Sequence, residues 1–259
     1  MAIAHRATEV YASSGTALSH NMTIPADAQV GDLLILVVSN RQLNITPEQP
    51  SGWVLGSIDA TGAAHNLATL LRECQAGDPG STVQLTWLTA TDPQGGIVAY
   101  SGVDTSNLAG IQLTKILNNA SGNTHTAPTI TPTVADTLLV HTWVTGSNTP
   151  NWESADAGTE RFQAVAIAGT ARPTLFVDRP GPASGVASSA ITAKLLGTAN
   201  QACTMHTLAL PPSIPPVPTE TLRPNAALTL TNFTGAYTDI DQDPDTTPAE
   251  AGLIPTVDP

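Results

Sequence analysis

The strongest constraint on the fold is a pattern of short apolar runs that Gly, Pro, Asn and Asp clusters interrupt along most of the chain. The longest run, LLILVV at residues 33–38, has the length of a buried strand. The run TVQLTW at residues 82–87 alternates, with Val83, Leu85 and Trp87 on one face, as in a half-buried strand. No segment sustains the 3.6-residue period of a capped amphipathic helix. The sequence therefore predicts an all-β protein.

A weak internal repeat relates the first and second parts of this pattern. VGDLLILVVSN at residues 30–40 parallels VADTLLVHTWVTGSN at residues 134–148, and a tryptophan follows a proline turn in both parts, at Trp53 and Trp152. Two later pairs of runs keep the same order. This repeat predicts a jelly-roll-like, two-sheet β-sandwich made of two similar halves, each supplying roughly five strands.

Further strands are expected in both halves and, less clearly, between them. The connecting segment carries Ile111, Leu113 and Ile116, which suit either a crossing strand or one helical turn. The other expected strands are residues 66–74, 96–103, 137–145, 162–168, 174–178, 189–195 and 203–210.

The composition limits the kinds of partner and compartment. There are 9 basic and 21 acidic residues, and the net charge of −12 repels phosphate groups, so neither nucleic acid nor a membrane surface is an expected partner. The start lacks the apolar segment of a secretory signal, and no run is long enough to span a membrane. Cys74 and Cys203 are expected as buried free thiols, with a single bridge between strands as the alternative.

The composition of the chain changes after residue 210, where prolines become frequent. Residues 211–224, PPSIPPVPTETLRP, contain six prolines, and proline cannot donate to a sheet and favours an extended backbone. We therefore expect a β-sandwich domain at residues 1–210, a linker at residues 211–224 and an acidic C-terminal arm at residues 225–259. The arm is too short to bury its own core, so it is expected to order only against a partner. The residues expected to contact that partner are Pro215, Pro216, Phe233 and Tyr237.

Motifs of the familiar enzyme classes, such as G-x-S-x-G, HExxH and the P-loop, are missing from the sequence. His141 and His206 fall in strand patterns, which indicates buried, hydrogen-bonded histidines. Glu73 and Asp178 take matching places in the two halves beside arginines, which indicates structural ion pairs, with a glycosidase carboxylate pair as the alternative. We expect no enzymatic activity and no cofactor, with a calcium ion as the alternative.

That calcium ion would belong to the acidic stretch DIDQDPDTTPAE at residues 239–250. Asp239, Asp241 and Asp243 fall at positions 1, 3 and 5 of the EF-hand loop template, but Pro244 replaces the glycine that the loop needs at position 6. The expectation is a solvated acidic arm, and a calcium site of a different kind at these three aspartates is the alternative.

One tryptophan is a candidate platform for a sugar ring. Flat aromatic faces stack on sugars in carbohydrate-binding sandwiches, whereas buried tryptophans pack cores. All four tryptophans are expected to pack in the core. Trp143 has the opposite strand parity from Val140 and Val144, so it is the one that this pattern could turn outward as the alternative.

Four motifs in the first half resemble a β-sandwich module of structural proteins from tailed phages of actinobacteria, usually called minor tail proteins. The motifs are GDLL at residues 31–34, PSGW at 50–53, R-x-x-x-AGDP at 72–79 and AYSGVD at 99–104. The resemblance extends over approximately residues 8–211. It implies a β-sandwich in a virion component, with no catalytic residues to carry over.

The resemblance leads to an expected function in assembly. We expect a virion structural protein of the minor tail type that contacts other virion proteins, forms a homo-oligomer and is assembled in the cytoplasm of the bacterial host. A capsid decoration protein is one alternative. A carbohydrate-binding module that attaches to a cell-surface glycan is the other.

Overall fold

The computed structural model of the chain describes residues 2–13, 15–40, 47–60, 66–118, 122–146, 151–153, 155–164, 172–196 and 201–213. They lie in a compact unit that ends at Pro215 and consist of antiparallel strands, with one 3-10 helix, η1 (Leu108–Gly110). The all-β prediction is confirmed. Within this described part, no helix has the length and apolar character needed to cross a membrane.

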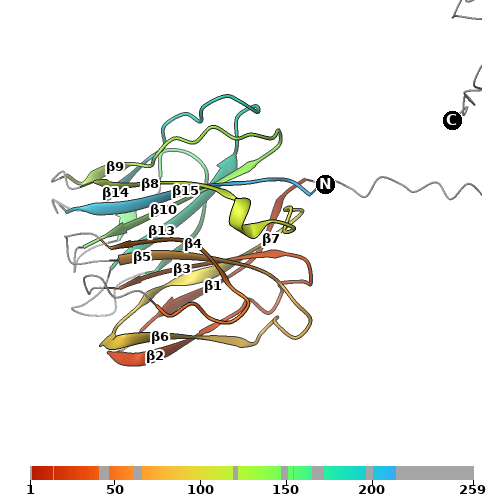
Figure 1. Cartoon of the computed structure of the whole chain (residues 1–259). Helices are drawn as coiled ribbons and strands as arrows, with labels where there is room; N and C mark the ends of the chain where they lie inside the picture. The colour runs from red at the N-terminus through yellow and green to blue at the C-terminus, as the bar shows by residue number, and fades with distance from the viewer. Residues whose placement is uncertain are drawn as a thin grey trace, which may run out of the picture. The chain divides into compact units, whose positions relative to one another are not determined.

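Fifteen strands divide between the two halves of the chain (Figure 1). The first half contains β1 (Ala4–Ala12), β2 (Ala17–Thr23), β3 (Leu33–Asn40), β4 (Val54–Ala60), β5 (Asn66–Glu73), β6 (Thr82–Thr91) and β7 (Gln94–Ser101). The second half contains β8 (Gln112–Asn118), β9 (Thr124–Thr126), β10 (Leu138–Thr145), β11 (Trp152–Glu153), β12 (Thr159–Ala164), β13 (Thr174–Pro180), β14 (Thr192–Leu195) and β15 (Cys203–Leu210).

Each half builds one large and one small sheet in the same strand order. The first half forms β1-β7-β3-β5-β4 and β2-β6, and the second forms β8-β15-β10-β13-β12 and β9-β14-β11. The seven strands of the first half thus correspond in order to β8, β9, β10, β12, β13, β14 and β15, with β11 added beside β14. The prediction of two similar halves is confirmed.

The four sheets stack as layers (Figure 1). Apolar side chains of β3, β5 and β7 pack against those of β10, β12, β13 and β15, so the two large sheets face each other across a central core. The other face of each large sheet packs against the small sheet of its own half, which gives two outer cores. The sandwich is confirmed, but the sequence did not predict the small outer sheets, and the jelly-roll assignment stays a prediction.

Both halves have the same backbone contact at a corner just after a large-sheet strand ends, after β5 in the first half and after β13 in the second. The backbone N–H of Cys74 donates to Asp32 O after β5, and the N–H of Gly181 donates to Thr137 O after β13, at 2.8 Å in both cases. Residue 74 therefore corresponds to residue 181.

The segment between the halves contains both structures that its sequence allowed. The helical turn η1 comes first, and its N-cap Asn107 accepts a bond from the backbone N–H of Gly110 at 3.1 Å. Strand β8 follows and pairs with β15.

The compact unit continues past β15. The N–H of Asp104 donates to Pro211 O at 2.9 Å, and the N–H of Ser213 donates to Gly102 O at 2.8 Å. These two hydrogen bonds of residues 211 and 213 extend the antiparallel pairing beyond the domain boundary expected at residue 210. The compact unit ends at Pro215. Proline at residue 211 is compatible with this pairing because it contributes its carbonyl group, which needs no N–H.

Candidate functional site

The proposed glycan platform, Trp143, is not exposed. Its side chain is 0% exposed, and it lies between the large sheet of the second half and the small sheet β9-β14-β11. The indole Nε1–H donates to the backbone oxygen of His125 at 3.1 Å. The opposite parity was predicted correctly, but a sheet covers that face. The core position favoured for all four tryptophans is therefore confirmed at Trp143, and the outward-facing alternative is wrong.

The other three tryptophans lie in the outer cores, as expected. Trp53 and Trp87 pack between the sheets of the first half, and Trp152 packs between those of the second. Trp53 precedes β4 and Trp152 begins β11, so each follows the central strand of its large sheet, β3 or β10. The repeated tryptophan is therefore a core residue in both halves.

Several predicted site residues lie outside the described part of the chain, which stops at Ser213. They are the calcium candidates Asp239, Asp241 and Asp243 and the partner-contact candidates Pro215, Pro216, Phe233 and Tyr237. These assignments stay predictions. In the described part, no group of three or more His, Cys, Asp or Glu side chains is close enough to hold a metal ion.

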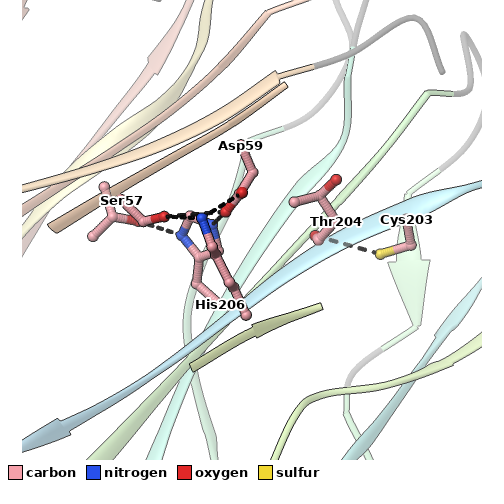
Figure 2. Close-up of polar contacts among 7 residues, drawn as sticks. Ser57, Asp59, Cys203, Thr204 and His206 are labelled. Carbon is pink, nitrogen blue, oxygen red and sulfur yellow. Dashed lines mark hydrogen bonds and ion pairs between the residues drawn. The ribbon is translucent and has the colours of Figure 1, made fainter. Parts of the chain in front are cut away.

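The two cysteines are free and buried, which confirms the favoured prediction. Cys74 lies in the outer core of the first half and Cys203 in that of the second, so the alternative of a bridge is wrong. Cys203 donates weakly to Thr204 O at 3.6 Å, as Figure 2 shows, and burial raises the pKa of its thiol well above the usual value. A thiol held in its protonated form is a poor nucleophile.

A polar network joins the two halves at one side of the central core. We call it the Asp59 network: Ser57, Asp59 and Thr69 from the first half, and Lys115 and His206 from the second. His206 Nε2 lies 2.8 Å from Asp59 Oδ2, and Lys115 Nζ lies 2.7 Å from Asp59 Oδ1. Ser57 Oγ donates to Asp59 Oδ2 at 3.1 Å, and Figure 2 shows this carboxylate facing the imidazole.

Charge and burial settle the protonation of this network. Burial tends to raise the pKa of Asp59, but hydrogen bonds from His206 and Lys115 lower it to about 2. Burial lowers the pKa of His206, and Asp59 only partly opposes that effect. Since the ionised carboxylate can only accept, His206 is neutral with its proton on Nε2, and Nδ1 accepts from the Thr69 hydroxyl at 2.9 Å.

Thr69, His206 and Asp59 have the hydrogen-bond order of a hydroxyl–imidazole–carboxylate triad. A catalytic triad needs a hydroxyl that a substrate can reach. Thr69 is 0% exposed and faces the central core, as does His206. The arrangement is therefore suited to holding β5 against β15 and not to attacking a substrate.

A second network joins the halves through Asp178. The Tyr100 hydroxyl and the Arg161 Nε both donate to Asp178 Oδ2, each at 2.7 Å. Asp178 is 2% exposed, and burial together with the Asp178 charge raises the pKa of Tyr100 well above its usual value. The edge of the His5 ring packs against Tyr100, with ring centroids 5.8 Å apart.

The two networks use equivalent strands of the internal repeat, but their residues do not take equivalent positions along those strands. The Asp59 network links β4 and β5 to β8 and β15, and the Asp178 network links their counterparts β12 and β13 to β7. His5 of β1, the counterpart of β8, completes the second set. Each side of the central core therefore has its own polar connection between the halves.

The proposed match between Glu73 and Asp178 is wrong. Counting back one residue from the equivalent corner bonds, Glu73 corresponds to Pro180, and Asp178 corresponds to Leu71. Glu73 accepts from the Thr105 hydroxyl at 2.9 Å, away from the ion pair that holds Asp178. The motif alignment failed because a shift of two residues preserves strand parity.

The predicted buried histidines are confirmed at His141 and His206. His141 Nε2 accepts from Arg179 Nε at 3.2 Å, so Nδ1 carries the proton and donates to the Thr207 hydroxyl at 3.0 Å. Burial and the Arg179 charge lower the pKa of His141 to about 3. The ring is thus neutral at physiological pH.

Cations in the described part are used for internal contacts. Arg6 pairs with Asp32, and Arg72 pairs with Asp78 at 2.8 Å. The remaining ion pairs of basic side chains are Lys115–Asp59, Arg161–Asp178 and Lys194–Glu153. Each of these basic side chains therefore has a carboxylate partner within the compact unit.

Comparison of the chain with family models, with curated proteins and with solved structures gives no match.

Proposed function

We propose that the chain is a virion structural protein of the minor tail type, which acts by assembling with other proteins of a tailed phage particle. The proposal rests on the four-motif resemblance in the first half. One observation supports it: the residues of these motifs depend on each other for packing, as the signature of a structural module requires.

The contacts among the motif residues are specific. Arg72 and Asp78 of the R-x-x-x-AGDP motif form an ion pair, and Asp78 Oδ2 also accepts from the Gln75 N–H at 2.7 Å. Gly52 of the PSGW motif lies beneath the same arginine, because a Cβ there would be 3.6 Å from Arg72 Nη1. Trp53 of that motif fills the outer core. Two of the motifs, from separate parts of the sequence, thus stabilise one corner.

The glycan-binding alternative loses its motivating residue because Trp143 is buried. Capsid decoration uses the same assembly chemistry as tail association, so it remains the alternative position in the particle.

Mass spectrometry of purified particles from a phage that encodes this chain tests the proposal. We expect the chain in the particles at a reproducible copy number, and gold-labelled antibody against it on the tail in electron micrographs. Label on the capsid shell would assign the protein to decoration instead. Absence of the chain from purified particles would contradict both positions.

A further inference from the structure

A groove of about 800 Å³ lies where the described chain leaves the compact unit. We call it the exit groove. Its walls are the start of β1 at residues 2–3, the turn and strand start at 135–138, the segment 180–183 after β13, and the last described residues, 212–213. Alanine, proline, isoleucine and leucine dominate these walls, and Asp136 is the one charged residue among them.

Exposed apolar side chains extend the surface beside this groove. Val134 is 43% exposed and Val186 is 51% exposed. The loops that carry them are held together, since the Gly185 N–H donates to Pro132 O at 2.8 Å. Exposed apolar side chains beside an apolar groove are typical of a protein–protein contact.

The internal repeat supplies a comparison for the same corner. In the first half, Asp32 stands where the second half has Thr137, and Arg6 of β1 and the Gln29 N–H both bond to its carboxylate. The corner of the first half is thus closed by charge, and that of the second half is open and apolar. This difference in side chains lies at a position where the two halves have the same backbone hydrogen bond.

We propose that the exit groove binds the proline-rich segment 214–224 of a neighbouring copy of the chain. The segment begins IPPVP, which is as apolar and proline-rich as the groove walls. Arg223 is the only basic residue after Ser213, so it can pair with Asp136, the only charge on the walls. This inference rests on the proposed function, because it assigns the contact through which copies assemble.

The position of the exit explains why the donor is another copy. Proline favours an extended backbone that does not reverse within a few residues, and Pro215, Pro216 and Pro218 follow directly after the groove rim. From its sequence, we therefore expect such a segment to continue from the rim and not to turn back into the groove beside it. Because donor and acceptor sites are adjacent, each copy can pass its segment to the next one, and such head-to-tail contacts close into a ring when the rotation allows.

Cross-linking between two variants that each carry one added cysteine tests the exchange. Ala183 is an exposed wall residue and Val217 lies in the segment, and both are replaced by cysteine in separate, differently tagged full-length chains. The native thiols are buried and should not react. We expect a short bismaleimide to give a covalent heterodimer from the mixed chains.

Ala76→Cys is the matched control, because Ala76 takes the place of Ala183 in the first half and is also exposed. It should give no heterodimer with Val217→Cys. Failure of Ala183→Cys and Val217→Cys chains to form a heterodimer would overturn the proposal. This holds whether a single chain that carries both changes cross-links within itself or does not cross-link. The measurement uses purified chain, so its result is independent of whether the protein is found in particles.

The charge pair gives a second test, by light scattering of the full chain over a range of concentrations. Asp136 has a φ of 56°, which asparagine tolerates, so Asp136→Asn should fold. We expect Asp136→Asn and Arg223→Gln each to weaken association about twofold to fivefold, and the double variant to be no weaker than either. Additive losses in the double variant would show that the two residues do not meet and would overturn the pairing.

Discussion

Single buried polar groups determine how the two halves are held together. Asp178 carries a negative charge at 2% exposure and is compensated by Arg161 and Tyr100, which both donate to one of its oxygens. Asp59 is compensated by Lys115 and His206 but is closer to solvent, with 22% of its side chain exposed. Removing one member of a buried ion pair lowers the free energy of unfolding more than removing one at the surface. The remaining member is then a buried charge without a partner.

Asp178→Ala should lower the free energy of unfolding by about 3–5 kcal/mol, because it leaves the Arg161 charge and the Tyr100 hydroxyl without their acceptor. Urea denaturation followed by tryptophan fluorescence measures the change. Glu160→Ala is the control: Glu160 is exposed and contacts Gln163, so it should change stability by less than about 0.5 kcal/mol. A loss below about 1 kcal/mol for Asp178→Ala would contradict the role assigned to it.

His141 makes stability depend on pH. Its pKa is about 3 in the folded chain and 6.5 as the unperturbed value. Between these values the unfolded chain binds a proton that the folded chain does not, so stability is full above pH 6.5 and falls as pH decreases. We expect this histidine to cost about 3 kcal/mol of stability between pH 7 and pH 4.

His141→Gln removes the titrating group and should make the decrease in stability between pH 7 and pH 4 smaller by that amount. Urea midpoints at several pH values measure it. His5, His125 and His206 also have lowered pKa values, so part of the decrease remains in the variant. Equal decreases in the two proteins would show that His141 does not stay neutral.

At the scale of elements, β7 is the strand that needs glycine. It pairs with β1 on one side and β3 on the other, and Gly95 and Gly96 lie at its start. A Cβ at Gly95 would lie 1.8 Å from Val37 O, and one at Gly96 would lie 2.8 Å from Glu9 O. The two neighbouring strands approach β7 on the side where a side chain would stand.

Gly95→Ala should therefore destabilise the chain by more than about 3 kcal/mol, since β3 backbone in the central core would have to move. Gly77→Ala is a matched substitution in an open turn, where nothing lies within 4 Å and only the φ of 89° opposes alanine. Its cost should be about 1–2 kcal/mol. Thermal unfolding of both variants measures the contrast, and similar losses would contradict the close packing at β7.

For the whole molecule, the central core makes the halves interdependent. Its residues come from β3, β5 and β7 on one side and from β10, β12, β13 and β15 on the other. A fragment ending at Asp104 would expose Leu33, Ile35, Val37 and Val98 to water. We expect residues 1–104 alone to aggregate or remain unfolded, as judged by circular dichroism and light scattering. A monomeric, cooperatively unfolding fragment would show that the halves are independent domains.

The end of the compact unit gives a second prediction at this scale. Truncation after Pro215 should leave the free energy of unfolding unchanged. Truncation after Leu210 removes the bonds that Pro211 and Ser213 make to Asp104 and Gly102, and should cost about 1–3 kcal/mol. Comparing the two truncated proteins locates the end of the compact unit. Equal free energies of unfolding for the two would show that the unit ends at residue 210.

Local patterns determined several of the strands and their repeat, but not β1, β2 or β4. The runs at residues 66–74 and 203–210 became β5 and β15 with ends within one residue, because period-two alternation and turn residues are local signals. The internal repeat could be recognised in the sequence because equivalent strands bury equivalent faces and so have similar apolar patterns. The buried states of His141, His206, Cys74 and Cys203 followed from the same strand patterns.

Contacts between distant strands were decided only by the tertiary structure. The sequence gives no sign that Asp59 meets His206, or Tyr100 meets Asp178, because 147 and 78 residues separate them. Parity placed Trp143 on the second face of its sheet, but whether that face meets water or another sheet depends on where β9 and β14 lie. Local periodicity determines which face a side chain takes, and the packing of the layers determines what that face meets.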